Sequence, residues 1–178
     1  MRIITIADTH IKDGPIKGQI PPALIELFKE ADLLIHAGDF VSRDVYEELS
    51  GIKRLEAVYG NMDEMALKNI LPRRKVVDIE NIRIGIVHEA ALSLQDTTGA
   101  RYMAKEMGVD ILVFGHIHKP VIEKSDVLLV CPGSPTAPRL SEPSAVELII
   151  DERGVSGKVI TFEGEGCSAI QSARYFMK

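Results

Sequence analysis

Two histidines stand one residue apart, directly after an apolar run, in this 178-residue chain. The run Asp-Ile-Leu-Val-Phe (110–114) leads into Gly115-His116-Ile117-His118, although the chain has only five histidines. In an extended segment alternate residues point the same way, so the two side chains can be aimed at one place. Because imidazole is a common metal ligand, the pair indicates a metal-binding function.

Other candidate ligands follow other strand-like runs. Asp8-Thr9-His10 follows the first run, Gly38-Asp39 the second, Gly60-Asn61-Met62-Asp63 the third, and His88 the run 82–87. In α/β sheets, bound molecules and ions lie at the carboxyl ends of the strands, so these side chains are expected to meet there. The mixture of carboxylate, imidazole and amide oxygen suits Mn, Fe, Zn, Co or Ni better than Ca or a thiolate site. Seven ligands are too many for one ion and suit two ions with a bridging carboxylate: Asp8, His10, Asp39, Asn61, His88, His116 and His118.

The order of these motifs resembles that of the calcineurin-like metallophosphoesterase superfamily. Asp-x-His, Gly-Asp, Gly-Asn-x-Asp, a lone His and Gly-His-x-His follow one another over residues 8–118. A later Pro-Gly-Ser and Arg139 extend the similarity to the superfamily's small single-domain prokaryotic phosphodiesterases. The resemblance implies a dinuclear phosphodiesterase in which a metal-bridging hydroxide attacks phosphorus in line.

The resemblance also implies a role for each ligand. Asp8, His10, Asp39 and His118 would hold one ion, and Asp39 would bridge to the second. Asn61, His88 and His116 would complete the second ion's ligands. Mn²⁺ or Ni²⁺ is the expected metal, with Zn²⁺, Fe²⁺ and Co²⁺ as alternatives, and a small phosphoester is the expected substrate. Three residues are the predicted catalytic set: Asn61, Asp63 and His88.

The patterns around these motifs predict an α/β fold. Short apolar runs at 2–7, 33–37 and 55–59 alternate with helical patterns that open at Pro22 and Ser42, as in a parallel sheet. In the second half, a helix ending at Gly108 stands among predicted hairpins at 80–81, 125–126 and 152–154. Such hairpins favour two packed sheets. We therefore predict a four-layer sandwich of two mixed β-sheets flanked by helices, which the resemblance also implies. Residues 1–163 would form the single domain, and residues 164–178 a loosely packed tail.

Composition and charge exclude several classes. A net charge of −5 and a pI near 5.6 argue against a nucleic-acid surface. No apolar run reaches the ~18 residues of a membrane span. The strand-like run begins at Ile3, which leaves no signal-peptide pattern. Two cysteines are no disulfide framework, so a cytoplasmic location is expected. The oligomeric state stays open, a homodimer or homotetramer included.

Several residues admit a second interpretation. His36 lies inside an apolar run, which favours a structural role over metal ligation. Asp63 is either a helix N-cap or a residue that orients Asn61. Cys131 is expected to be a small buried hydrophobe. Arg139 and Lys119 are either surface charges or phosphate partners.

Two positions depart from the superfamily pattern. Larger relatives have a histidine that assists the leaving group where this chain has Met62, and relatives commonly have glycine where Glu89 follows His88. A carboxylate there would either crowd the phosphate or point to solvent, so the activity could be slow or narrow. The rival function is a protein-binding scaffold with a vestigial metal site, like the small retromer subunit, whose site lacks part of this ligand set.

Overall fold

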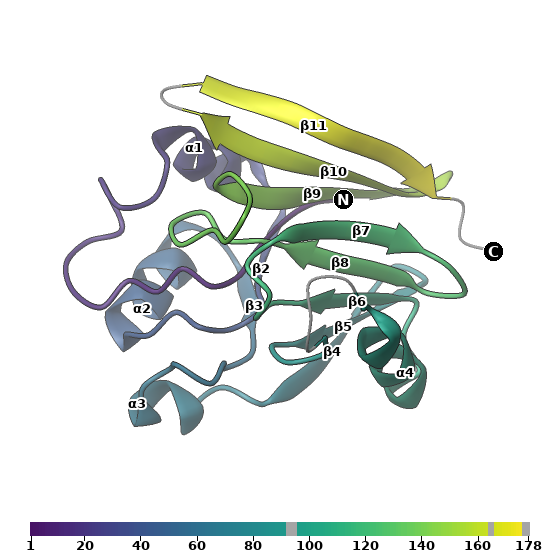
Figure 1. Ribbon diagram of the computed structural model, residues 1–178, viewed down its shortest axis with the longest axis horizontal. Coiled ribbons are helices and arrows are strands. Elements are labelled where there is room, and N and C mark those ends of the chain that lie inside the picture. The colour runs from purple at the N-terminus through teal and green to yellow at the C-terminus, as the bar shows by residue number, and fades with distance from the viewer. Residues whose placement is uncertain (92–95, 164–165, 176–178) are drawn as a thin grey trace.

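The computed structural model describes residues 1–91, 96–163 and 166–175, with side chains as far as Phe162. Within these residues the chain forms four helices and eleven strands (Figure 1). The helices are α1 (Pro22–Glu30), α2 (Arg43–Ile52), α3 (Met65–Lys68) and α4 (Thr98–Met107). The strands are β1 (Arg2–Ile6), β2 (Leu33–His36), β3 (Leu55–Ala57), β4 (Arg74–Ile79), β5 (Ile82–Val87), β6 (Ile111–Phe114), β7 (Pro120–Lys124), β8 (Leu128–Pro132), β9 (Ser144–Asp151), β10 (Gly154–Glu163) and β11 (Gly166–Tyr175).

The strands form two mixed sheets. One has six strands in the order β11-β10-β9-β1-β2-β3, and the other has five in the order β4-β5-β6-β8-β7. β1, β2 and β3 run parallel in the first sheet, and β5, β6 and β8 run parallel in the second. The outer pairs are antiparallel, and three of them are the predicted hairpins: β4–β5, β7–β8 and β9–β10. The predicted pair of mixed sheets is confirmed.

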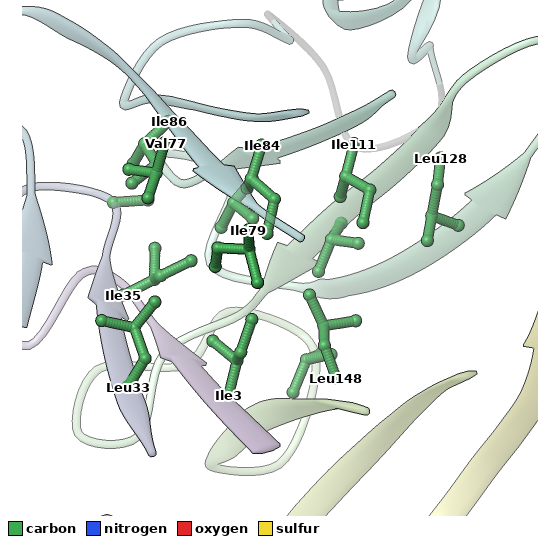
Figure 2. Close-up of a cluster of buried hydrophobic side chains, with 14 of the residues drawn as sticks. Ile3, Leu33, Ile35, Val77, Ile79, Ile84, Ile86, Ile111, Leu128 and Leu148 are labelled. Atoms are coloured by element: carbon green, nitrogen blue, oxygen red, sulfur yellow. The ribbon is translucent and has the colours of Figure 1, made fainter. Parts of the chain in front are cut away.

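Alternate residues of the strands build different layers of the core. Ile3 of β1 packs between the sheets, whereas Ile4 packs beneath α1 and α2 with Phe28 and Leu49. Figure 2 shows the central layer, where side chains of β1 and β2 meet those of β4, β5 and β6. A third cluster joins the other face of the second sheet to Ala100 and Ala104 of α4. The order helices, sheet, sheet, helix is the predicted four-layer sandwich.

Local signals explain most element ends. Pro22 begins α1, where its fixed φ and missing N–H cost little, and Gly108 ends α4 in the left-handed conformation at φ 62°. Ser42 precedes α2 as predicted, but its side chain makes no capping hydrogen bond. The strand predicted over 55–59 ends at Ala57, where its pairing with β2 ends, and the Tyr59 N–H bonds the Pro72 carbonyl instead.

The segment predicted as a C-terminal tail contributes an edge strand. β11 pairs antiparallel with β10 along its length, with a register shift between Val159 and Ile160. Residues 164–165 and 176–178 lie outside the described part, so the domain boundary stays a prediction. No helix in the described ranges is long and apolar enough to cross a membrane.

Candidate metal centre

The seven predicted ligands meet at one end of the two sheets. Asp8 and His10 follow β1, Asp39 follows β2, and Asn61 lies in the turn after β3. The other sheet supplies the remaining three directly after its parallel strands, His88 after β5 and then His116 and His118 after β6. The sheets are tied together here, since the His116 N–H donates to Asp8 Oδ2 at 3.0 Å. Parallel strands thus place the ligands at their carboxyl ends, as expected.

Three of these side chains form a first cluster. His118 Nε2 lies 3.3 Å from Asp8 Oδ1 and 3.2 Å from His10 Nε2. His10 Nε2 is 3.8 Å from Asp8 Oδ1. One ligand atom from each residue falls within 4.8 Å of the other two, a spacing that can hold one metal ion.

A second cluster lies beside the first. Asp39 Oδ2 is 3.2 Å from His88 Nε2, and His88 Nε2 is 3.0 Å from Asn61 Oδ1. His116 Nδ1 is 3.2 Å from the same Asn61 oxygen. Asp39 Oδ2 is also 3.6 Å from His10 Nε2. Asp8, Asp39 and His88 form a second group whose ligand atoms lie within 4.8 Å of one another.

Two carboxylates therefore lie near both clusters, and hydrogen bonds distinguish them. Asp39 Oδ1 accepts the Met62 N–H at 2.7 Å, which leaves Oδ2 between His10 and His88. Asp8 accepts the His116 N–H at 3.0 Å through Oδ2 and at 3.3 Å through Oδ1, and its Oδ1 also faces His10 and His118. The geometry favours Asp39 as the residue that both clusters share.

Hydrogen bonds to carbonyls orient two of the imidazoles. His88 Nδ1 lies 2.8 Å from the Ala37 carbonyl oxygen, and His118 Nδ1 lies 2.5 Å from that of Ala137. A carbonyl only accepts, so each Nδ1 carries the proton. Each Nε2 is then left with a lone pair that points into its cluster, the arrangement typical of metal-binding histidines. The donor set fits divalent transition metals.

The backbone is strained at these positions. Five predicted ligands adopt a positive φ, a conformation that costs a residue other than glycine of order 1–3 kcal/mol. Asp and His tolerate it better than most residue types. Such strain persists only where the surrounding structure imposes it, and it gathers at functional sites. The values are 56° for Asp8, 48° for His10, 61° for Asp39, 73° for His116 and 56° for His118.

Glycine is required where two of the loops approach each other. A Cβ on Gly60 would lie 2.2 Å from Asp39 Oδ1, and a Cβ on Gly115 would lie 3.0 Å from Asp8 Oδ2. A larger residue at position 60 would displace the Asp39 carboxylate, and one at position 115 would press on the Ala37 carbonyl and the Asp8 carboxylate.

Burial and neighbouring charge shift the titration of the ligands. Burial raises the pKa of the Asp8 carboxyl to about 7. Burial acts on Asp39 in the same direction, but the hydrogen bond and charge of His88 outweigh it and lower the pKa of Asp39. Burial lowers the pKa of His10 and of His118. Burial also opposes the charged form of His88, but Asp39 and Asp8 outweigh it and raise the pKa of His88. Neutral imidazoles are the form that binds metal.

Asp63 holds the loops that carry the ligands. Its Oδ2 accepts the N–H of Gly60 at 2.7 Å and that of Asp39 at 3.1 Å, and its Oδ1 accepts that of Val41 at 2.7 Å. Glu64, not Asp63, occupies the N-cap position of α3, so the N-cap interpretation of Asp63 is wrong. The physical reason is that three backbone donors of the neighbouring loops already surround this buried carboxylate.

His36 contacts two of the loops that carry predicted metal ligands. It is fully buried, its Nδ1 accepts the Gly38 N–H at 3.1 Å, and its Nε2 lies 3.2 Å from Thr9 Oγ1. Its ring stacks on Phe40 at 3.4 Å between centroids. The pKa of His36 lies well below its usual value because of burial. These contacts are structural, and Cys131 is likewise a buried free thiol.

Two positioning residues were not among the predicted site residues. Ser134 Oγ donates to the Asp8 carbonyl at 2.7 Å and accepts the Ala137 N–H at 2.8 Å. Thr136 Oγ1 donates to the Thr9 carbonyl. The segment after β8 therefore clamps the loop that carries Asp8. The Pro132-Gly133-Ser134 motif was the available signal.

The remaining candidates divide between two hollows. Arg139 and Met62 line a hollow of about 440 Å³ that opens onto His10, Asp39 and His116. Glu89 lines a different hollow, of about 270 Å³, with its Oε2 3.8 Å from Arg73 Nη2. Lys119 is exposed and lines neither hollow.

Comparison with known proteins agrees with this geometry. A "Probable metallophosphoesterase" of Methanothermobacter thermautotrophicus is 38% identical over 98% of this chain and 100% of its own length. A phosphodiesterase of Methanocaldococcus jannaschii is 30% identical over 75% of this chain and 83% of its own length. Vacuolar protein sorting-associated protein 29 (Vps29) of Schizosaccharomyces pombe is also 30% identical, over 84% of this chain and 81% of its own length.

A solved structure shares the fold. Vps29 of Chaetomium thermophilum superposes with a TM-score of 0.84 at 23% identity, over 99% of this chain and 97% of that one. Residues 1–153 match the family model described as the calcineurin-like phosphoesterase superfamily domain. The chain therefore belongs to the calcineurin-like phosphoesterase superfamily.

Proposed function

We propose that this protein is a phosphodiesterase that depends on two divalent metal ions. The observation that carries the proposal is the place of Asp39 Oδ2, 3.6 Å from His10 Nε2 in one cluster and 3.2 Å from His88 Nε2 in the other. A carboxylate oxygen between two sets of nitrogen ligands is what a bridged pair of ions requires. The relative named as a phosphodiesterase supports diesters as the substrate class.

The ligands divide in this proposal as the two clusters suggest. Asp8, His10 and His118 hold one ion with Asp39. Asn61, His88 and His116 hold the other with the same Asp39. When bound, two such ions would acidify a water molecule and neutralise charge on the phosphate oxygens.

The chain's own residues would place the substrate. Arg139 lines the hollow over the centre, and its N–H donates to the His118 carbonyl at 3.2 Å, so its backbone is fixed to a ligand-bearing loop. Its guanidinium can bind two phosphate oxygens at once. Met62 borders the same hollow and has no proton to donate to a leaving group.

The metal follows from the donors. The clusters combine carboxylate, amide and imidazole, and Cys131 is buried elsewhere, in the core beneath α4. We propose Mn²⁺ or Ni²⁺, with Zn²⁺, Fe²⁺ or Co²⁺ as substitutes. A small phosphoester would be the partner, in the reducing cytoplasm.

Metal analysis followed by an ester panel tests the proposal. Purified protein should contain divalent metal, and chelation should abolish hydrolysis of nitrophenyl diesters until metal is restored. Monoesters, assayed beside the diesters with each metal, should be cleaved more slowly. Undiminished turnover in excess chelator, with metal loss confirmed, would overturn the proposal, and ultracentrifugation of the same samples gives the oligomeric state.

The rival function is a protein-binding scaffold. The similarity to Vps29 of Schizosaccharomyces pombe favours it. Against it, all seven predicted ligand positions carry ligand residues, and they meet in one place. Metal-loaded protein that cleaves no ester of the panel would leave the scaffold as the better proposal.

A further inference from the structure

The smaller hollow adjoins the metal centre on the side of Asn61 and His88. It has a volume of about 270 Å³, below the ~300–1,000 Å³ of sites that enclose a whole drug-sized ligand. It can therefore hold one group of a substrate whose reacting phosphorus lies at the metals. Its walls carry Lys68, Arg73, Arg74 and Glu89, which the function proposed above does not use.

The hollow is cationic although the chain is acidic. Three cations and one carboxylate line it, a balance of about +2 beside a chain of net charge −5. A concave wall of one sign concentrates ligands of the opposite sign. Arg74 also pairs at 3.0 Å with Glu106, which does not line the hollow, and this ion pair reduces the positive charge of the hollow without reversing its sign.

The fold brings these cations together from separate segments. Lys68 ends α3, and its Nζ donates to the Asn61 carbonyl at 2.9 Å, directly beside a predicted metal ligand. Arg74 opens β4 and pairs in register with Val87 of β5, so the segment 73–74 lies alongside the His88 turn. The Tyr59 N–H bonds the Pro72 carbonyl at 3.1 Å and fixes that segment to the loop after β3. The cations thus have a defined place relative to the centre.

Among the described residues, Arg73 is the cation of this hollow whose side chain makes no hydrogen bond, whereas Lys68 and Arg74 each make one. Its guanidinium has five N–H donors, and its Nη2 stands 3.8 Å from Glu89 Oε2, beyond hydrogen-bond length. Its side chain is 71% exposed, so a ligand can reach it. Guanidinium groups bind phosphate with paired hydrogen bonds.

We propose that this hollow, lined by Lys68, Arg73, Arg74 and Glu89, binds a second phosphate of the substrate. The inference rests on the proposed function and narrows its substrate class to phosphodiesters that carry an additional terminal phosphate. Glu89 competes with that phosphate for Arg73 and weakens its binding. This assigns the Glu89 position a part in specificity.

A matched pair of esters tests the proposal. One is the nitrophenyl ester of thymidine 5′-phosphate, and the other is the same ester with an added 3′-phosphate. The metal-loaded protein should cleave the second with kcat/KM at least tenfold higher. The double variant Arg73→Gln/Arg74→Gln should lose this preference while it cleaves the first ester within about twofold of the wild type.

Two further variants separate local binding from overall charge. Lys29→Gln, on the exposed side of α1, removes a cation far from the hollow and should leave the preference unchanged. Glu89→Gln should increase the preference. A preference that is absent in the wild type, or that survives Arg73→Gln/Arg74→Gln, overturns the inference.

Calorimetry gives a readout that needs no hydrolysis. Metal-loaded protein should bind thymidine 3′,5′-bisphosphate at least tenfold more tightly than thymidine 5′-phosphate, and the double variant should bind both alike. Protein that cleaves neither ester yet keeps this difference would refute the proposed function and support the phosphate site. Protein that cleaves both esters equally and binds both nucleotides equally would do the reverse.

Discussion

The carboxylate of Asp63 holds the backbone of Asp39, since its Oδ2 accepts the Asp39 N–H at 3.1 Å. The same carboxylate accepts the N–H groups of Val41 and Gly60, and it is 3% exposed. Asp63 therefore sets the position of Asp39, whose Oδ2 lies between His10 Nε2 and His88 Nε2. This contact makes two neighbouring carboxylates separable by experiment.

Asp39→Asn and Asp63→Asn should fail in different ways. Asp39→Asn removes the shared anion and should lower activity and metal content far more. Asp63→Asn places an amide NH₂ among three backbone N–H donors and leaves one of them unpaired, which should lower the free energy of unfolding by about 1–3 kcal/mol. Because Asp63 supports the ligand loops from outside the clusters, its replacement should also weaken metal affinity by about 10–100-fold. Metal titration and urea unfolding of the chelated variants measure both effects. Near-normal turnover with retained metal in Asp39→Asn would refute the ligand assignment.

Gly60→Ala should release metal although it adds a single methyl group. The new Cβ would meet Asp39 Oδ1 at 2.2 Å and push the carboxylate from its place. Gly51→Ala is the matched control, because Gly51 lies in α2 with no atom within 4 Å of the added Cβ. The control should keep its metal and gain about 0.5–1 kcal/mol of stability from helix propensity. Equal metal affinity in the two variants would contradict the tight approach of these loops.

Asp8→Asn should stabilise the metal-free protein at high pH. Burial raises the pKa of Asp8 to about 7, above its unfolded value, so its contribution to stability is complete below the unfolded pKa and is lost as pH rises through about 7. Asparagine does not titrate, so the variant should be more stable than wild type at pH 8, by on the order of 4 kcal/mol, and similar to it near pH 4. Urea unfolding in chelator across this range measures the difference. Added metal should reverse the order at pH 8, because only the wild type retains its full ligand set. A difference that does not vary with pH would rule out this role for Asp8.

Met62→His should restore a general acid at the edge of the centre. Met62 is 55% exposed and lines the hollow over Asp39 and His116, so a polar side chain of similar size fits there. Its backbone N–H, which holds Asp39 Oδ1, is kept. A positioned general acid typically contributes 10²–10⁴-fold. The variant should therefore speed cleavage of alkyl esters selectively and change aryl esters little.

Rates against leaving-group pKa, for both proteins saturated with metal, measure this effect. The wild type should depend strongly on the leaving group. A flat dependence would show that another group already donates the proton.

The sequence by itself determined the ligand types and the order in which strands deliver them. Two continuous apolar runs end at Gly38-Asp39 and Gly115-His116. Each carries two local signals, one for a buried strand and one for a sharp turn, and the folded structure shows both features. The hairpins at 80–81 and 125–126 were readable for the same reason, because turn residues act over two or three positions. The two mixed sheets followed from the count and order of such signals.

Only the tertiary structure decided which groups face one another. Asp63 and Asp39 are 24 residues apart, and Ser134 and Asp8 are 126 apart, so no local pattern distinguishes a helix cap from a support for another loop. The direction of Glu89, toward Arg73 in the smaller hollow and not into the hollow over His10, Asp39 and His116, depends on β4 pairing with β5. Long-range pairing brings these groups within hydrogen-bond or Coulomb range, and those energies fall off within a few ångströms.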